Sequence, residues 1–421
     1  MASKNKIWRK LLGVEKVAIE ELDFDEEQEA LMVSVRPLGR GRRRCSVCGR
    51  RCAGYDQGSG RRRWRGLDLG TVKVFLEAEA VRVRCPEHGV VVAEVPWARP
   101  DSAFTRAFED QCGWLAVHTS RTAVSQLMRV AWRTVGRIVD RIADETMART
   151  DLLSGLRRIG IDELSYRKGH KYLTVVVDHD SGRLVWIAPG RDSETLCQFF
   201  DALGPERSDA LELVSADGAA WIDEAVRERA PQAVRCLDPF HVVQWASKAL
   251  DEVRRSVWND LRKGGEPEQA KDLKGARWAL WKNPGNLTAR QRRTLAWVAT
   301  ANAPLYRAYL LKEGLRTVFQ ARGLTTALVR LDAWLAWACR CRIQPFVKLA
   351  RTIRQYRPRI EATLRHGLSN ALVEGRNTQL RLLHRIAHGF HNVNAFIALA
   401  MLKLGGLCPA LPGRILPTGV S

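Results

Sequence analysis

The chain has 421 residues, 46% of them hydrophobic, and its 68 Lys and Arg residues outnumber its 46 Asp and Glu residues, which gives a net charge of +22. A charge surplus of this size indicates a polyanionic partner, with nucleic acid first, because each cation set against a phosphate releases condensed counterions. We find no apolar run long enough to span a bilayer and no secretory leader. We therefore expect a cytoplasmic protein without membrane contact, of about two to four domains, whose ten cysteines form no disulfide framework.

Two short spacings near the start of the chain predict a structural zinc site. Cys45 and Cys48 are separated by two residues in RRRCSVCGRRC, and Cys85 and His88 are separated by two residues in CPEHG. Four such ligands close a tetrahedral site. The two pairs lie further apart than in the usual zinc finger, and Cys52 competes with His88 as the fourth ligand. The alternative is a set of incidental cysteines beside a basic pair of strands.

Two segments are candidates for contact with DNA. Residues 61–84, RRRWRGLDLGTVKVFLEAEAVRVR, read as a basic hairpin, and residues 119–144 read as two short helices with a turn near Val130. The second pattern is typical of a helix-turn-helix motif, although any three-helix bundle can show it. The candidate DNA-binding residues are Arg61, Arg62, Arg63 and Arg65 in the hairpin, and Trp132, Arg133, Thr134 and Arg137 at the start of the second helix.

From residue 157 the pattern changes to strands that alternate with helices. Strands are expected at 157–164, 171–178, 182–190, 211–218 and 233–238, and helices at 193–204, at 219–230 and from Pro239. Three strands in a meander followed by alternating helix and strand is the order of an RNase H-like fold, so the expected class is multi-domain α/β. Between about residues 250 and 360 the strand signals disappear, and Trp-rich helical windows predict an all-helical insertion whose Trp side chains are core.

The segment 369–390, SNALVEGRNTQLRLLHRIAHGF, reads as a basic helix with one carboxylate, Glu374. At about 100° per residue, Glu374 shares a polar stripe with Asn370, Asn377 and Arg381, while apolar side chains lie roughly opposite. We expect the helix to bury its apolar face and to present Glu374 among donors that suit phosphate. The alternative is an ordinary amphipathic helix with a surface glutamate.

Glu374 and two aspartates are candidates for a cation site. Asp162 lies inside the apolar strand RIGIDEL, and Asp217 ends the strand LVSADG, at the edge where open α/β sheets collect ligands. If the basic helix packs beside these strands, the three carboxylates suit Mg²⁺ or Mn²⁺. The competing acids are Asp178, Asp192, Asp223 and Asp238.

Such a site suits chemistry at phosphorus. Two cations would activate a water or a DNA 3′-hydroxyl and stabilise the leaving oxygen in an in-line displacement. Arg381 would neutralise charge on the phosphate. Asp238 is the strongest competitor, because His241 follows it by one helical turn in DPFH.

These residues resemble bacterial insertion-sequence transposases of the ISL-three family, which use a DDE triad of acids on an RNase H-like fold. The resemblance covers nearly the whole chain and includes LLGVEKVAIEELDF, the Cys/His knuckles, the helix-turn-helix, IGIDELSYRKGHKYLTVVVD, DPFHVV, RWALWKNPGNLTARQ, AYLLKEGLRTVF and SNALVEGRNTQLRLLHRIAHGF. By position it implies that Asp162, Asp217 and Glu374 are the metal-binding triad.

The resemblance also implies roles for neighbouring residues. Asp238 and His241 match the family's C/D-x-x-H element, and Arg381 takes the basic position seven residues after the glutamate. His88 departs from the commoner all-cysteine zinc pattern, which leaves Cys52 as the alternative ligand.

The implied function is a DNA transposase that binds the terminal inverted repeats of its own element, cleaves phosphodiester bonds and transfers 3′-hydroxyl ends to target DNA. The implied setting is the bacterial cytoplasm in association with the nucleoid, and the pairing of two element ends implies a homodimer or a larger assembly. One alternative is a non-catalytic DNA-binding regulator or inactive derivative, against which the three intact acids weigh. Another is a nuclease that hydrolyses without joining.

The expected domains follow one another along the chain. They are an N-terminal segment at 1–40, zinc-binding knuckles at 41–98, the helix-turn-helix at 99–150, an RNase H-like catalytic domain at 151–249 and 361–405, a helical insertion at 250–360 and a tail at 406–421.

Overall fold

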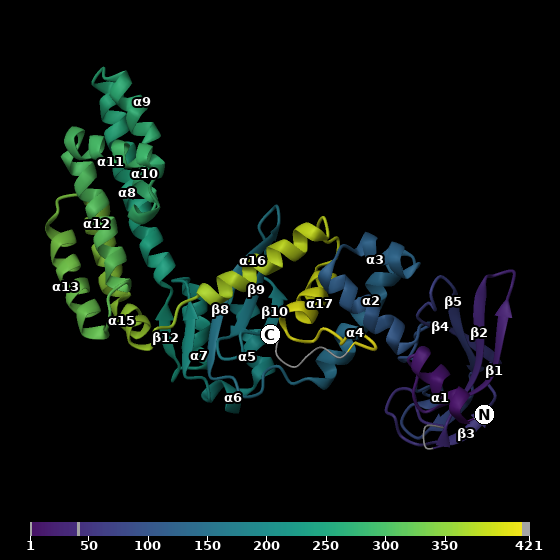
Figure 1. Cartoon of the computed structure of the whole chain (residues 1–421). Coiled ribbons are helices and arrows are strands. Elements are labelled where there is room, and N and C mark those ends of the chain that lie inside the picture. The colour runs from purple at the N-terminus through teal and green to yellow at the C-terminus, as the bar shows by residue number, and fades with distance from the viewer. Residues whose placement is uncertain (1, 40–42, 415–421) are drawn as a thin grey trace. The chain divides into compact units, whose positions relative to one another are not determined.

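The computed structural model describes residues 2–39 and 43–414, and the chain divides into two compact units (Figure 1). The first unit is Met1–Asp151 with Leu382–Ser421, and the second is Leu152–Arg381. Residues 40–42, at the border of the expected N-terminal and zinc-binding segments, and residues 415–421 of the expected tail lie outside the described residues. The mixed α/β class expected from the sequence is confirmed.

The first unit contains a four-stranded sheet with the order β1-β2-β5-β4. Its strands are β1 (Val17–Asp25), β2 (Ala30–Pro37), β4 (Arg61–Arg65) and β5 (Lys73–Glu79), and α1 (Ala2–Leu11) precedes them. β4 and β5 pair antiparallel, so the basic segment forms the predicted hairpin. The sheet buries Val33 and Leu76 against Trp64, which meets Trp97 edge-on with 5.4 Å between ring centroids.

The first unit also contains a three-stranded sheet next to the predicted zinc ligands. Its strands are β3 (Ala53–Asp56), β6 (Arg82–Cys85) and β7 (Gly89–Val92), in the order β3-β6-β7. β6 pairs antiparallel with both neighbours. Cys85 therefore ends the central strand, and His88 lies in the turn to β7.

Helices complete the first unit, namely α2 (Arg106–His118), α3 (Arg121–Met128), α4 (Trp132–Arg149) and α17 (Val393–Leu404). Ser120 caps α3, and Arg129 ends it in a left-handed conformation with φ of 52°. α4 begins at the predicted Trp132 but runs for 18 residues, so the expectation of a short second helix is wrong. α17 packs on α2 and α4, which divides the expected segment 361–405 between the two units.

The second unit is built on a five-stranded sheet with the order β10-β9-β8-β11-β12. Its strands are β8 (Arg158–Arg167), β9 (Lys171–Asp178), β10 (Leu184–Pro189), β11 (Leu213–Ala216) and β12 (Val234–Leu237), and its flanking helices are α5 (Ser193–Leu203), α6 (Pro205–Asp209) and α7 (Ala220–Arg229). β8, β9 and β10 pair antiparallel, whereas β11 lies parallel between β8 and β12. The predicted meander and the strands that follow it are confirmed.

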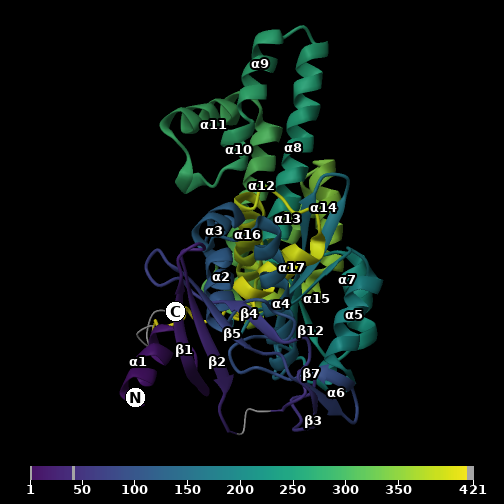
Figure 2. The same cartoon turned by 90° about the vertical axis from the view of Figure 1, so that its right-hand side faces the viewer.

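In the rest of the second unit, the described elements between β12 and residue 366 are helices. The elements are α8 (Pro239–Lys263), α9 (Pro267–Gly275), α10 (Arg277–Trp281), the 3-10 turn η2 (Pro284–Asn286), α11 (Ala289–Ala301), α12 (Ala303–Phe319), α13 (Leu324–Arg340), α14 (Gln344–Gln355) and α15 (Arg357–His366). α8 leads from β12 into a bundle in which it packs on α12 and α14 (Figures 1 and 2).

The Trp side chains of this bundle divide between core and surface. Trp334 is buried and donates from Nε1 to Leu311 O at 2.7 Å. Trp278 is 63% exposed, so the expectation of a core role is wrong for this residue. Among the described helices of the chain, none combines the length and the apolar composition that a membrane crossing requires.

Candidate functional site

Three aspartates lie at one edge of the sheet of the second unit. Asp162 lies within β8, Asp217 follows the last residue of β11, and Asp238 follows the last residue of β12. Carrying the observed parallel registers forward by one or two residues places the three acids opposite one another on adjacent strands. The Asp238 N–H donates to Ala216 O at 3.1 Å, which continues the ladder to this point.

α16 (Ala371–Ile386) brings Glu374 to the same sheet. Val373 of this helix is fully buried, and a Cβ at Gly160 of β8 would lie 2.4 Å from its Cγ2. The missing side chain at Gly160 therefore allows the helix to pack directly on the strand that carries Asp162.

The two Asn side chains of the polar stripe face the interior, whereas Arg381 of the same stripe is exposed. Asn370 and Asn377 are each 1% exposed. Asn370 donates from Nδ2 to Ile161 O at 3.0 Å and from its backbone N to Asp238 Oδ1 at 3.2 Å, and Asn377 donates from Nδ2 to Asp162 Oδ2 at 2.8 Å. The expectation that this whole stripe meets phosphate is therefore wrong, because its two amides satisfy buried acceptors of the sheet.

A short relay of hydrogen bonds, from His179 through Ser215, holds the side chain of Asn370 in place. His179 Nε2 lies 2.7 Å from Ser215 Oγ, and the Ser215 hydroxyl donates to Asn370 Oδ1. Ser215 is fully buried on β11, so the relay joins α16 to the strand that leads to Asp217. Burial lowers the pKa of His179, which favours the neutral ring in this relay.

The aspartates act on one another electrostatically. Burial raises the pKa of Asp162 to about 6, the hydrogen bond from the Glu163 N–H opposes the rise, and the charge of Asp217 adds to it. Burial also raises the pKa of Asp238, against the hydrogen bond from Asn370 N. These shifts describe carboxylates that share a buried edge of the sheet.

Glu374 belongs to the same electrostatic neighbourhood. Burial raises its pKa, the charge of Asp238 raises it further, and His241 and Arg381 lower it. His241 Nε2 lies 4.0 Å from Asp238 Oδ2, as the spacing of DPFH suggests. Asp238 and both of the predicted basic residues, His241 and Arg381, therefore act electrostatically on Glu374.

Among the described residues, the acids of this edge have no arginine or lysine partner: no Arg or Lys nitrogen there comes within 4.0 Å of a carboxylate oxygen of Asp162, Asp217, Asp238 or Glu374. Two buried acids elsewhere, Glu109 and Asp251, each pair with two arginines. The edge therefore keeps negative charge that the protein itself does not neutralise.

The other competing acids have structural partners. Asp178 accepts from the Ser181 N–H at 2.9 Å, and Asp192 caps the first turn of α5. Asp223 pairs with Arg235 at 2.9 Å. Of the competitors, only Asp238 joins the candidate cation site.

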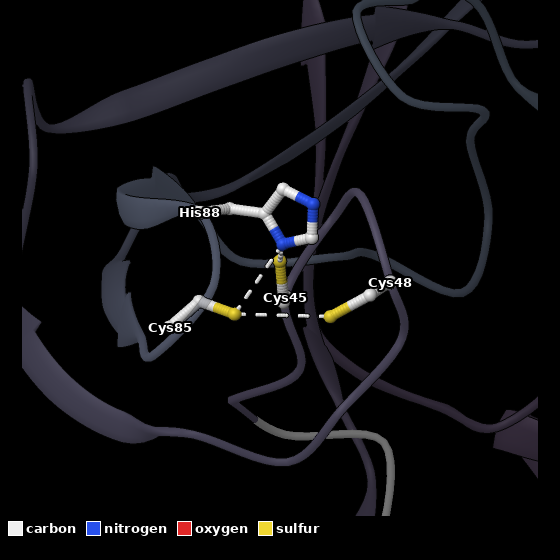
Figure 3. A group of neighbouring side chains, drawn as sticks. All are labelled: Cys45, Cys48, Cys85 and His88. Carbon is white, nitrogen blue, oxygen red and sulfur yellow. Dashed lines mark hydrogen bonds between the residues drawn. The ribbon is translucent and has the colours of Figure 1, made fainter.

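The four predicted zinc ligands come together in the first unit (Figure 3). Their ligand atoms all lie within 4.8 Å of one another, and Cys48 Sγ to Cys85 Sγ is 3.7 Å, Cys45 Sγ to His88 Nδ1 is 3.8 Å and Cys85 Sγ to His88 Nδ1 is 3.5 Å. Zn–S bonds of about 2.3 Å at a tetrahedral angle separate the sulfurs by about 3.8 Å, so the spacing fits zinc. Across residues 2–39 and 43–414, no other group of Cys, His or carboxylate ligands is gathered this closely, the acids of the second unit included.

Local turns build each half of this cluster. Gly49 and Gly89 follow the two pairs, each with φ of 67°, a conformation that glycine adopts without strain. The hydrogen bond with His88 lowers the pKa of Cys85 to about 6, toward the thiolate that a metal requires. Cys52 lies outside the group, and its thiol donates to a backbone carbonyl at 3.3 Å.

The start of α4 presents the predicted groove-facing residues. Trp132 is 47% exposed, and the Arg121 guanidinium stacks on its ring at 4.3 Å. Arg133 and Arg137 are exposed, and neither forms an ion pair with any described residue. Thr134 is half-buried. The exposed cations are therefore available to DNA.

The basic hairpin behaves differently from the expectation. Arg61 and Arg63 are exposed, but both pair with Glu77. Arg65 is 7% exposed and pairs with Asp68. The expectation that Arg65 contacts DNA is wrong, because its guanidinium is used inside the unit.

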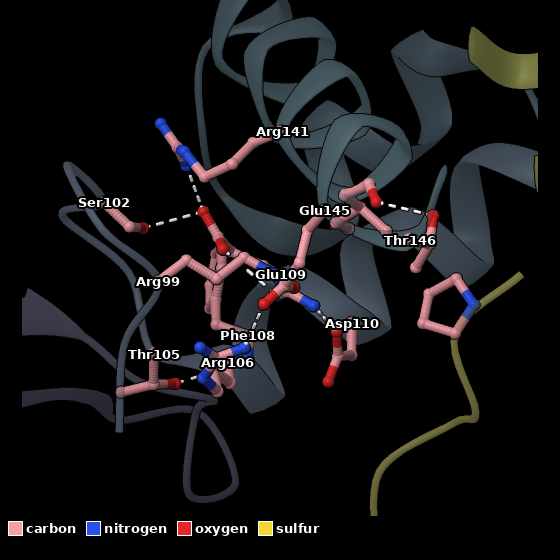
Figure 4. A network of polar contacts seen from close by, with 12 residues as sticks. Arg99, Ser102, Thr105, Arg106, Phe108, Glu109, Asp110, Arg141, Glu145 and Thr146 are labelled. Atoms are coloured by element: carbon pink, nitrogen blue, oxygen red, sulfur yellow. Dashed lines mark hydrogen bonds and ion pairs between the residues drawn. The ribbon is translucent and has the colours of Figure 1, made fainter. Parts of the chain in front are cut away.

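A buried ion-pair network, which we call the Arg99 hub, ties the segment before α2 to two helices (Figure 4). Arg99 donates to Glu109 Oε2 at 3.2 Å and to Asp110 Oδ1 at 2.6 Å on α2, and to Glu145 on α4. Burial alone would lower the pKa of Arg99, but Asp110 and Glu145 raise it above its ordinary value. Sequence reasoning missed this network, because one arginine in a chain rich in them carries no signal.

Comparison with protein families gives three matches along the chain. Residues 159–400 match a model described as transposase, residues 93–143 match the helix-turn-helix domain of transposase family ISL3, and residues 41–88 match the zinc-finger of transposase IS204/IS1001/IS1096/IS1165. A DNA-binding helix-turn-helix and a zinc finger on one chain with a transposase domain define a DNA-cleaving transposase. The zinc-finger match and the Cys/His cluster together support a structural zinc site.

Whole-chain relatives agree with these matches. The transposases for insertion sequence element IS1557 from two strains of Mycobacterium tuberculosis, CDC 1551 / Oshkosh and ATCC 25618 / H37Rv, are each 54% identical to this chain over 97% of both sequences. The transposase for insertion sequence element IS1001 from Bordetella parapertussis is 27% identical over 93% of this chain and 96% of that protein. The chain belongs to the ISL3 (ISL-three) family of insertion-sequence transposases.

Proposed function

We propose that the second unit is an RNase H-like core that carries out DDE chemistry with Asp162, Asp217 and Glu374. The strand order β10-β9-β8-β11-β12, with three antiparallel strands followed by two parallel ones, supports this fold. The observations that support the proposal are the parallel register of β8 and β11, which carried forward by two residues sets Asp162 beside Asp217, and the packing on β8 of α16, the helix that carries Glu374. The assigned triad matches the positions that the family resemblance implies.

The carboxylates of this edge suit hard divalent cations. Without an Arg or Lys partner among the described residues, they retain the charge and the oxygen lone pairs that Mg²⁺ or Mn²⁺ binds. When bound, these ions activate the nucleophile and stabilise the leaving oxygen of an in-line displacement at phosphorus. His241 orients Asp238, and the exposed Arg381 neutralises charge on the DNA phosphate.

The first unit supplies DNA recognition. Cys45, Cys48, Cys85 and His88 hold a structural zinc ion that fixes the small sheet. The residues that contact DNA are Arg61, Arg62 and Arg63 in the hairpin and Trp132, Arg133, Thr134 and Arg137 on α4. The exposed cations of α4 at the position of a recognition helix support DNA contact, and the DNA that the family resemblance implies is the terminal inverted repeats of the element that encodes this chain.

The complete reaction requires two ends and a target. The chain cleaves at the element ends and transfers the 3′-hydroxyls to target DNA, as a homodimer or a larger assembly that forms on the paired ends, in the bacterial cytoplasm.

The proposed domains are those expected from the sequence, namely residues 1–40, 41–98, 99–150 and 151–249 and the helical insertion at 250–360. After the insertion the chain returns to the catalytic sheet. Their support is the order of the elements along the chain.

The test is an assay of strand cleavage and joining with full-length protein on DNA that carries the element's own ends, in Mg²⁺ or Mn²⁺. Asp162→Asn, Asp217→Asn and Glu374→Gln should each abolish both reactions and leave end binding intact. Asp201→Asn is the matched control, because it changes an exposed acid near the C-terminal end of α5, and it should cleave like the wild type.

Three other outcomes would each contradict part of the proposed function. A wild type that binds the ends and cuts under neither metal makes the chain a DNA-binding regulator or an inactive derivative. Cleavage without joining makes it a nuclease. Cleavage by Glu374→Gln at the wild-type rate removes Glu374 from the triad.

A further inference from the structure

α16 carries two buried amides on the same stripe as Glu374, one four residues before it and one three residues after it. Residues at these spacings lie on one helical face. Asn370 reaches the backbone of β8 and Asp238, and Asn377 reaches Asp162. This segment therefore presents a carboxylate between two amides; the side-chain amide of Asn377 contacts Asp162, whereas Asn370 contacts Asp238 through its backbone N–H.

The Asp162 carboxylate receives one neutral donor on each oxygen. The Glu163 N–H donates to Oδ1 at 2.8 Å, and Asn377 Nδ2 donates to Oδ2 at 2.8 Å. A carboxylate oxygen has two lone pairs, so each oxygen keeps one that is open to a cation. The two hydrogen bonds thus stop the carboxylate from rotating while its charge and half of its acceptor capacity remain.

Stability alone does not explain Asn377. Its Oδ1 is buried and has no hydrogen-bond partner among the described residues. A buried polar atom without a partner costs about 1–3 kcal/mol, so an apolar side chain of similar volume would fit the fold better. What an apolar side chain lacks is the Nδ2 donor to Asp162.

We propose that Asn377 is a positioning residue for the catalytic cation, which holds the Asp162 carboxylate in the orientation that binds Mg²⁺ or Mn²⁺. This inference rests on the proposed DDE chemistry. Asn370 supports it by locking the start of α16 to β8 and, through Ser215, to β11, which sets the position of Asn377 along the strand. Groups that hydrogen-bond a metal ligand typically change metal affinity by about 10–100-fold when they are removed.

The experiment measures metal binding separately from catalysis. Full-length wild type and Asn377→Leu, which removes the donor and keeps the number and branching of the side-chain heavy atoms, are titrated with Mn²⁺, and free Mn²⁺ is read from its electron paramagnetic resonance signal. We expect about 10–100-fold weaker Mn²⁺ binding, a similar rise in the Mg²⁺ concentration that half-saturates end cleavage, recovery of cleavage at high Mg²⁺, and unchanged end binding. Gln379→Ala, an exposed change on the same helix, is the control and should match the wild type.

A second variant guards against misfolding. Asn377→Ala removes the same donor and cannot overpack the site, so it should show the same shift in metal affinity. A loss of cleavage in both variants that high Mg²⁺ does not recover, with wild-type Mn²⁺ binding, overturns the positioning role.

The inference and the proposed function fail differently. If Asp162→Asn loses Mn²⁺ binding and cleavage while both Asn377 variants keep wild-type values, the inference is wrong and the proposed function stands. If Asp162→Asn itself binds Mn²⁺ and cleaves like the wild type, the proposed function is wrong and Asn377 has no cation ligand to position.

Discussion

Arg99→Ala should destabilise the first unit strongly, because it removes the centre of the Arg99 hub. Arg99 is 7% exposed, and its three acidic partners include Glu109, which is fully buried. Removing one member of a buried ion pair costs about 3–5 kcal/mol, because the remaining charge is left without compensation. Glu109 keeps its contact with Arg141, so we expect the lower end of this range, about 3 kcal/mol.

The measurement is hydrogen–deuterium exchange of peptides from α2 and α4 in the full-length chain, which reports on the first unit separately from the second. A loss of about 3 kcal/mol should lower protection about 100-fold, because each 1.4 kcal/mol is a factor of ten. Arg106→Ala is the control, since Arg106 is 30% exposed and, among the described residues, pairs with Glu145 alone; it should cost at most about 1 kcal/mol. Equal losses in the two variants would refute the reasoning.

Three further predictions test separate parts of the chain. Gly160→Ala should lower the free energy of unfolding in urea by about 1–3 kcal/mol, because its Cβ has no room against α16. Gly375→Ala, where the Cβ meets nothing within 4 Å, should raise the free energy of unfolding by about 0.5–1 kcal/mol. An unchanged free energy of unfolding in Gly160→Ala would contradict the direct packing of α16 on β8. Elemental analysis should detect zinc in the wild type and in Cys52→Ser, and none in Cys85→Ser; zinc loss in Cys52→Ser would make that cysteine a ligand. Arg133→Ala should reduce the slope of log K against log salt for end binding by about 0.9, measured by fluorescence anisotropy, and an unchanged slope would show that Arg133 contacts no phosphate.

Local patterns were sufficient for the elements of the second unit. The β-rich runs RRIGIDEL and KYLTVVVD predicted β8 and β9, and the run SETLCQFFDALG predicted α5, each close to the observed bounds. These patterns work because each element contributes buried apolar side chains to the same core. The turn predicted near Val130 lies between α3 and α4, where Arg129 ends α3 in a left-handed conformation.

Residues whose role depends on distant partners were not readable. Strand alternation groups Arg65 with Arg61 and Arg63 on one exposed face, yet Arg65 is buried, with its guanidinium over the rings of Phe75 and Phe108. The role of Asp192, by contrast, had a local signal, because an aspartate directly before a helical run is an N-cap.

The candidate site shows the same division between local and distant information. Helical periodicity placed Asn370, Glu374 and Asn377 on one stripe, which is correct as geometry. It could not show which way the stripe faces, because the acceptors are a carbonyl on β8 and the carboxylates of Asp162 and Asp238, far away in the sequence. A polar stripe that meets buried acceptors points inward, and only the folded sheet supplies those acceptors.

The choice of donors explains how a chain with a net charge of +22 can keep a cation site. Outside the site, the buried acids Glu109 and Asp251 each pair with two arginines. At the edge of the sheet the donors are neutral, namely the side chain of Asn377 to Asp162, the backbone of Asn370 to Asp238 and a backbone N–H to Asp217. A neutral N–H orients a carboxylate and leaves its charge for a metal, whereas a guanidinium would fill both oxygens and cancel that charge. Amides next to a lone glutamate in a basic helix are therefore what a cation site needs in a protein whose other surfaces bind DNA.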